Sequence, residues 1–218
     1  MLRAITPKTR VVFVANPNNP TGTLAPVSDL MRLVSEVPPH VLLVMDEAYI
    51  EFLDEPCDLL PLIRGGKTPN LLLMRTFSKI YGLAGLRLGY GIGHPDLIAA
   101  LEKVRQPFNI NSLVQAGALA AVDDEEHIQR TRRNNSAGLR FFETAFKELN
   151  LRFVPSAANF LLVHVGDGQR VFGELQKLGL IVRPMAGYGL GEWIRISIGT
   201  EAENSRCLTA LKKVLALQ

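Results

Sequence analysis

The sequence predicts an α/β protein, in which a mostly parallel β-sheet is followed by a smaller α+β part. Three observations predict this fold. Short apolar runs recur between Val11 and Ile92, and turn-forming or charged residues bound them, as is typical of strands buried on both faces. A segment with helical spacing separates the first two of these runs. Beyond Pro95 the pattern changes to longer helices and a few short strands, which indicates a second folding unit.

In the first part, a helix is predicted over Val27–Val37 and the strands are predicted over Val11–Ala15, Val41–Met45, Leu71–Met74 and Leu88–Ile92. Strands joined through helices run parallel, with right-handed crossovers. Ligands of such sheets bind at the carboxyl ends of the strands. Polar residues follow three of the predicted strands, namely Asn19, Asp46 and Lys79. The pattern therefore predicts a single ligand site at this edge of the sheet.

The second part of the chain is predicted to contain the helices Ile98–Val104, Leu113–Val122, Glu125–Leu149, Arg170–Leu178 and Ala202–Leu217. Its predicted strands are Phe160–Val165, Ile181–Arg183 and Trp193–Ile198. We expect residues 1–108 to form a large domain, residues 109–136 to form interdomain helices and residues 137–218 to form a small C-terminal domain.

Composition excludes several classes of function. The 218 residues are 47% hydrophobic and carry a formal net charge of only +3, values typical of an ordinary globular protein. Arg130, Arg132 and Arg133 are interpreted as a solvated helix face and not as a nucleic-acid patch. No apolar run approaches the ~20 residues that span a bilayer, and the start of the sequence lacks a secretory signal. The two cysteines and four histidines show no metal-type spacing. We therefore expect a cytoplasmic protein with no metal site and no nucleic-acid or membrane partner.

Three motifs occur in a fixed order along the chain: NPNNPTG at 16–22, DEAY at 46–49 and SKIYGLAGLRLGY at 78–90. Together they resemble the signature of the aspartate-aminotransferase-like enzymes of fold type I, which use pyridoxal 5'-phosphate (PLP). The resemblance covers nearly the whole chain. The segment RTFSKIYGLAGLRLGYGI, with the later VRPM and WIRISIGT, resembles most closely the histidinol-phosphate aminotransferases. The resemblance implies the PLP-dependent transferase fold, with a partial large-domain sheet and a smaller C-terminal domain. It also implies amino transfer between L-histidinol phosphate and 2-oxoglutarate in histidine biosynthesis.

The chemistry of PLP explains why these motifs contain these residue types. A lysine amine must hold PLP covalently, and the resemblance assigns this role to Lys79, whose amine, once freed, would act as a general base. The cofactor withdraws electrons only while its ring nitrogen stays protonated, which requires a carboxylate partner. Asp46 matches that catalytic position, with a helix N-cap as the alternative interpretation. Tyr49 and Asn19 match the positions that hydrogen-bond the ring oxygen, with a plain core aromatic as the alternative for Tyr49.

The remaining matched positions are those that bind anions. Ser78 and Arg87 match the ligands of the cofactor phosphate. Because Arg87 stands between two leucines, we expect it to be buried against an anion, with phosphate favoured over a protein carboxylate. Arg195 interrupts an apolar alternation and matches the residue that binds the substrate carboxylate. Asn159 and Arg183 match further substrate contacts, and Arg183 would bind the substrate phosphate.

The resemblance also leads us to expect an N-terminally truncated chain, because the first motif appears early compared with family members. The expected partners are small-molecule substrates and a second copy of the chain in a homodimer. Two alternatives remain open. One is another fold-type I enzyme, such as an aromatic amino-acid aminotransferase or a threonine-phosphate decarboxylase. The other is a non-catalytic fragment that associates through exposed apolar surface.

Overall fold

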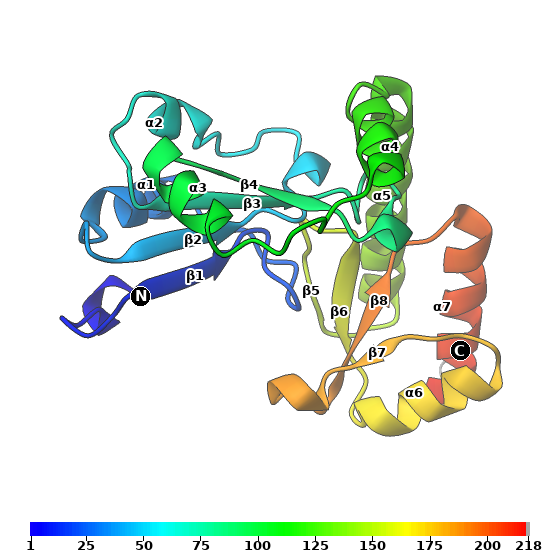
Figure 1. Ribbon diagram of the computed structural model, residues 1–218. Coiled ribbons are helices and arrows are strands. Elements are labelled where there is room, and N and C mark those ends of the chain that lie inside the picture. Colours follow the sequence, from blue (N-terminus) through cyan, green and yellow to red (C-terminus); the bar gives the residue numbers. More distant parts are fainter. Residues whose placement is uncertain (217–218) are drawn as a thin grey trace. The chain divides into compact units, whose positions relative to one another are not determined.

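The structure is a computed structural model that describes residues 1–216, and these form two compact units (Figure 1). The first unit contains residues 1–17 and 24–128. The second contains residues 18–23 and the chain from residue 129 onward. The division at residue 128 falls within the long helix α5 (Glu125–Glu148) and between the predicted boundaries at 108 and 136. The division into three parts stays a prediction.

The first unit is built on a four-stranded sheet in the order β1-β2-β3-β4 (Figure 1). Its strands are β1 (Val11–Ala15), β2 (Leu42–Asp46), β3 (Leu71–Thr76) and β4 (Gly89–Gly93). The first three run parallel, as predicted, whereas β4 pairs antiparallel with β3. The antiparallel pairing follows from the connection between β3 and β4, which contains only the short 3₁₀ turn η3 (Ala84–Leu86) and no crossover helix.

The helices of this unit are α1 (Val27–Glu36), α2 (Leu60–Arg64), α3 (Pro95–Glu102) and α4 (Ser112–Val122), with the 3₁₀ turns η1 (Leu2–Ala4) and η2 (Ile50–Phe52). Side chains of β2 and β3 pack against α1 and α2 in one core, which includes Leu30, Leu33, Leu43, Met45, Ile63, Leu71 and Leu73. Each such side chain contributes about 1.5–3 kcal/mol when it leaves water. Successive residues of a strand face opposite sides, so Asp46 lies on the face opposite to Met45 and this core.

The second unit contains an antiparallel sheet in the order β5-β6-β8-β7. Its strands are β5 (Phe153–Val154), β6 (Phe160–His164), β7 (Arg183–Pro184) and β8 (Trp193–Ser197), and the turn η4 spans Ala186–Tyr188. The helices that accompany it are most of α5, together with α6 (Gly168–Lys177) and α7 (Glu201–Leu215). This is the smaller α+β arrangement that the sequence predicts.

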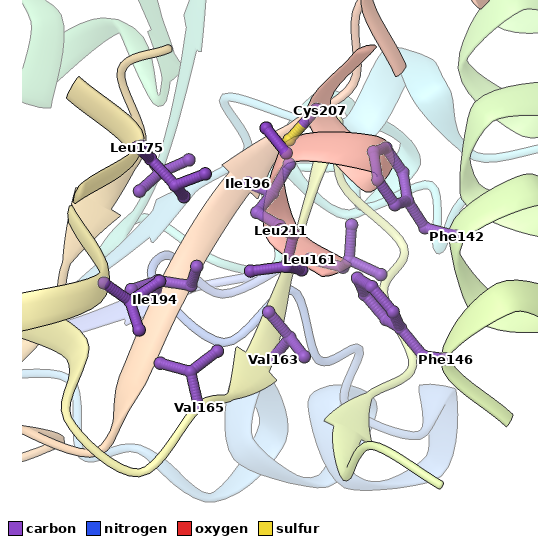
Figure 2. Packing of buried hydrophobic residues seen from close by; sticks show 13 residues of the cluster. Phe142, Phe146, Leu161, Val163, Val165, Leu175, Ile194, Ile196, Cys207 and Leu211 are labelled. Atoms are coloured by element: carbon purple, nitrogen blue, oxygen red, sulfur yellow. The ribbon is translucent and has the colours of Figure 1, made fainter. Parts of the chain in front are cut away.

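Figure 2 shows the core of the second unit, where three helices meet one face of the sheet. Its fully buried members include Phe142 and Phe146 from α5, Leu161 and Val163 from β6, Leu175 from α6, Ile194 from β8 and Leu211 from α7. Because Ile194 and Ile196 both point into this core, the alternation of β8 places Arg195 on the opposite face of the sheet.

Several element boundaries differ from those predicted. The strand predicted at Ile181–Arg183 is instead Arg183–Pro184, at the edge of the sheet, where a proline is tolerated. The helix predicted from Ile98 begins at Pro95, because His94 accepts a hydrogen bond from the Asp96 amide and caps the helix. The predicted helix end at Leu217 lies outside the described residues. Within residues 1–216, every helix is too short or too polar to cross a membrane.

Candidate active site

Lys79 is presented by a tight turn whose flanking side chains are buried. Phe77, Ile80 and Tyr81 pack together with residues of α4 and α5, whereas Lys79 itself is half-buried. The backbone closes around it, because the Leu83 amide donates to the Phe77 carbonyl at 3.0 Å and the Gly82 amide donates to the Lys79 carbonyl at 2.9 Å. The turn is thus fixed on both sides, which sets the point on the backbone from which the Lys79 side chain extends.

Tyr49 and Lys79 lie together in the first unit. The Nζ atom of Lys79 is 5.2 Å from the centroid of the Tyr49 ring, within the range of a cation–π contact. Tyr49 is buried and follows β2, the strand next to the one that leads to Lys79. The structure therefore places a phenol and an amine, both predicted site residues, beside each other.

Asp46 is the last residue of β2 and is exposed. One of its carboxylate oxygens accepts a hydrogen bond from the Ala48 amide at 3.1 Å. Asp46 is level with Met74 of β3 in the parallel ladder, and Met74 precedes Lys79 by five residues. The carboxylate is thus at the carboxyl edge of the sheet and is available to a positively charged ligand.

Ser78 and Arg87 differ in how well they match expectation. Ser78 is half-buried, and its amide donates to the Thr76 hydroxyl at 3.0 Å, which orders the start of the Lys79 turn. The expected burial of Arg87 is wrong, because this residue is exposed and its guanidinium donates to the Ala84 carbonyl at 2.9 Å. Arg87 follows the η3 turn with a φ of 54°, so it precedes β4 and does not share the alternation of that strand. Such left-handed backbone at a non-glycine residue is uncommon and is often found at binding sites.

In the second unit, Asn19 and Arg195 are hydrogen-bonded, with the guanidinium of Arg195 donating to the Asn19 side-chain oxygen. Asn19 belongs to the 18–23 loop, which packs against a distant part of the chain. The Ala157 amide donates to the Gly22 carbonyl at 2.8 Å, and a Cβ at Gly22 would overlap the Ser156 hydroxyl. The glycine of the first motif is therefore required by this close approach and by its φ of 75°.

Arg183 and Arg195 stand directly opposite each other on β7 and β8, so both point to the same face of the sheet. Both line a pocket of about 430 Å³, together with Phe172, Ile181, Val182, Pro184 and Ser197. The Arg195 guanidinium also lies 4.6 Å from the Phe160 ring centroid. Its Nε atom is buried and has no hydrogen-bond partner within residues 1–216. Two like charges set opposite each other are unfavourable unless an anion binds between them, so this pocket suits an anionic group.

Asn159 immediately precedes β6, and its carbonyl accepts a hydrogen bond from the Ile198 amide at 2.9 Å. The loop before it is held by Asn135 of α5, whose amide donates to the Ala158 carbonyl at 3.1 Å. Asn159 is thus fixed in the same unit as Asn19, Arg183 and Arg195.

Sequence reasoning did not name Arg75, which forms an ion pair with Glu47, the residue that follows Asp46. The sequence does contain a signal for it. Arg75 follows a run of apolar residues in β3, just as Arg195 interrupts the apolar residues of β8. An arginine within a buried strand needs an anionic partner, and in β3 that partner belongs to the protein.

Comparison with known proteins identifies the family of this chain. Residues 1–211 match the sequence profile of "Aminotransferase class I and II". The chain belongs to this aminotransferase family. A histidinol-phosphate aminotransferase of Akkermansia muciniphila is 53% identical over 98% of the chain, and one of Ralstonia nicotianae is 51% identical over 99%. The chain also resembles the solved structure of histidinol-phosphate aminotransferase from Sinorhizobium meliloti in complex with pyridoxal-5'-phosphate, with a TM-score of 0.85 and 32% sequence identity. The match covers 94% of this chain and 57% of the Sinorhizobium chain.

These matches confirm the fold type that the motifs predicted. The chain spans 58% and 59% of the length of the Akkermansia and Ralstonia relatives.

Proposed function

We propose that this chain forms part of a PLP-dependent aminotransferase that moves an amino group between L-histidinol phosphate and 2-oxoglutarate in histidine biosynthesis. Family membership and the names of relatives that are 51–53% identical support the proposal. The single observation that carries it is the presentation of the Lys79 amine on a buried turn beside Tyr49, at the carboxyl edge of the sheet.

The donor set of the first unit fits PLP. A half-buried amine at Lys79 suits a carbonyl group, and the exposed carboxylate of Asp46 suits a protonated ring nitrogen. The phenol of Tyr49 is a hydrogen-bond donor for a ring oxygen. Ser78 and Arg87 offer a hydroxyl and an exposed guanidinium for the cofactor phosphate, and the guanidinium of Arg87 is held by one hydrogen bond to a backbone carbonyl.

When bound, PLP supplies an electron sink that stabilises negative charge on the carbon next to the transferred amine. In our proposal Lys79 would hold the cofactor through its Nζ atom until the substrate amine displaces it, and the freed Nζ atom would then accept a proton from that carbon and donate it to the cofactor. Asp46 keeps a proton on the ring nitrogen through its negative charge. Tyr49, whose ring centroid lies 5.2 Å from the Nζ atom of Lys79, would donate a hydrogen bond from its phenol to the oxygen of the cofactor ring.

The second unit supplies anion binding in this proposal. Arg195 binds a carboxylate of the 2-oxoglutarate substrate through its guanidinium. Asn19 holds that guanidinium in place by accepting a hydrogen bond from it. Arg183, on the same face of the sheet, binds the phosphate of the phosphorylated substrate. Asn159 contributes a further polar contact to the substrate from the start of β6.

The proposal also includes a homodimer in the cytoplasm. Exposed apolar residues of the first unit support association, because Leu119 and Val122 of α4 are 70% and 45% exposed and lie one turn apart.

A titration of the 218-residue chain with PLP tests this proposal. We expect a visible absorption band that saturates, that is lost in Lys79→Ala and that persists in Lys67→Ala, an exposed lysine used as the matched control. L-Histidinol phosphate should then change the band at lower concentration than L-histidinol does. A band that survives in Lys79→Ala would contradict the proposal, as would equal responses to both compounds.

A further inference from the structure

A buried ion pair joins the ends of β2 and β3. The Nε atom of Arg75 donates to a carboxylate oxygen of Glu47 at 2.8 Å, and the side chains are only 17% and 3% exposed. The ion pair of Arg32 and Glu36 on α1 has the same 2.8 Å distance, but these side chains are 66% and 49% exposed. The Arg75–Glu47 pair is therefore largely removed from water, whereas the α1 pair is not.

Stability alone gives little reason for such a pair. Removing charges from water costs several kcal/mol per ion, and buried pairs are often replaced by apolar residues without loss. Burial raises the pKa of Glu47, and the hydrogen bond from Arg75 opposes that rise. Burial also acts to lower the pKa of Arg75, but the hydrogen bond to Glu47 and the negative charge of Glu47 raise it above its usual value. The two charges thus depend on each other, and a role in fixing geometry accounts for them better.

The position of the pair relates it to two predicted site residues. Glu47 directly follows Asp46, and its amide donates to the Met74 carbonyl of β3 at 2.8 Å. Alternation along the strands places Glu47 on the face opposite to Asp46, and Arg75 on the face opposite to Met74. The ion pair therefore ties the two strands together on one face, while Asp46 is presented on the other.

A chain of contacts also links Arg75 to the Lys79 turn. Arg75 is paired with Tyr90 across β3 and β4. The ring of Tyr90 lies 5.6 Å from that of Phe77, which in turn lies 4.9 Å from the ring of Tyr81. Lys79 lies between Phe77 and Tyr81 in the sequence. A change in the position of Arg75 would therefore disturb the rings on which the Lys79 turn rests.

We propose that Arg75 and Glu47 are positioning residues that fix the spacing between Asp46 and Lys79. They act through these two residues and not on the substrate. The inference rests on the proposed function, because the importance of this spacing follows from the binding of one cofactor by both residues.

The test compares Arg75→Lys, Arg75→Gln and Glu47→Gln with Arg32→Gln, which breaks the exposed pair on α1 and serves as the matched control. The first measurement is the dissociation constant for PLP and the wavelength of its visible band. Arg75→Gln and Glu47→Gln should weaken PLP binding about tenfold and shift the band, as expected for the loss of one charged hydrogen bond. Arg75→Lys keeps the charge without the planar fork, so it should recover part of the affinity. Arg32→Gln should behave like the parent chain.

The second measurement is hydrogen exchange of the cofactor-free chain, followed by mass spectrometry of its peptides. The amides of Phe77, Ser78, Gly82 and Leu83 are bonded within or beside the Lys79 turn. Their exchange should become several-fold faster in Arg75→Gln and Glu47→Gln, while peptides from α1 and from the second unit keep their rates. This measurement does not depend on PLP.

The outcomes separate the inference from the proposed function. Unchanged PLP affinity and unchanged exchange in all three variants would overturn the inference. A uniform rise in hydrogen exchange across the first unit, with the visible PLP band unchanged, would show a purely structural role for the ion pair. This result would also overturn the inference. If the parent chain takes up no PLP, the proposed function fails. In that case the exchange rates alone decide, with a rise confined to the Lys79 turn in favour of positioning and no rise against it.

Discussion

Arg183 and Arg195 face each other across two strands and share one pocket. Replacing Arg183 by Gln removes one of the two positive charges of this proposed phosphate site. We expect binding of L-histidinol phosphate to weaken about 10- to 100-fold, since a hydrogen bond to a charged group contributes about 1.5–3 kcal/mol. Binding of unphosphorylated L-histidinol should change much less. The measurement is a titration of the PLP band with each compound.

Arg170→Gln is the control for this substitution, because Arg170 is an exposed arginine on α6. The two variants should have similar free energies of unfolding, or Arg183→Gln should be the more stable, because it relieves repulsion between like charges. An equal loss of affinity for both compounds would contradict the phosphate role of Arg183.

The sequence predicted the wrong environment for Arg87, which is exposed, whereas Arg195 is partly buried, and the local backbone explains the difference. Arg195 and Arg87 both stand between apolar neighbours. Arg195 lies within β8, where alternation holds and its guanidinium is partly buried, whereas Arg87 precedes β4 in a left-handed conformation and is exposed. Apolar neighbours indicate the burial of an arginine only within a strand, and the turn before β4 places Arg87 outside one.

Helix α7 begins with a reciprocal cap that can be tested by itself. The Thr200 hydroxyl accepts from the Glu203 amide, and the Glu203 carboxylate accepts from the Thr200 amide at 2.7 Å. Thr200→Ala should destabilise the second unit by about 1 kcal/mol, a typical loss for a helix cap. Urea unfolding followed by the fluorescence of Trp193, the only tryptophan in the sequence, measures this unit directly.

The stability that this cap contributes should also depend on pH. The hydrogen bonds from Thr200 lower the pKa of Glu203 below its ordinary value of 4.5. A lowered folded-state pKa means that the contribution is fully present above pH 4.5 and is lost as the pH falls through the lowered value. The effect of Thr200→Ala should therefore shrink in acid. Thr144→Ala, at an exposed position within α5, is the control, and a similar loss in both variants would argue against the cap.

At the scale of elements, the sequence predicted the strands of the first sheet and its mostly parallel character, but it made no prediction for the direction of β4. Apolar runs indicate that a strand is buried, but they carry no information on its direction. Direction follows from the connection, and the residues between Phe77 and Leu88 form turns around Lys79 where a crossover helix would be needed for a parallel strand. The segment between Phe77 and Leu88 thus forms the Lys79 turn and, because it contains no crossover helix, also makes β4 antiparallel to β3.

At the scale of the whole molecule, the proposed homodimer can be tested through α4. Leu119 is 70% exposed, and burial of a leucine contributes about 1.5–3 kcal/mol. Leu119→Glu should weaken self-association at least tenfold, as measured by sedimentation equilibrium. Leu178→Glu, at a leucine of the second unit that is 37% exposed, should leave association unchanged. If both variants associate like the parent chain, α4 is not part of the interface.

The order of the two units along the chain could be predicted from the change in pattern near Pro95, but the membership of residues 18–23 could not. This segment lies within the first third of the sequence and belongs to the second unit. It does so through contacts between Gly22 and the 156–157 loop, which are more than a hundred residues away. Neighbouring residues in a sequence do not reveal such pairings, so Asn19 could be named as a site residue but not placed beside Arg195.

The most direct test of the central claim is to reduce the PLP-treated chain with borohydride and to locate the labelled lysine by peptide mass spectrometry. We expect the label to lie on the peptide that contains Lys79 and to be absent from the Lys79→Ala variant. Label spread over exposed lysines such as Lys67 and Lys103, or label at full stoichiometry in Lys79→Ala, would contradict the assignment of Lys79 as the cofactor-binding residue.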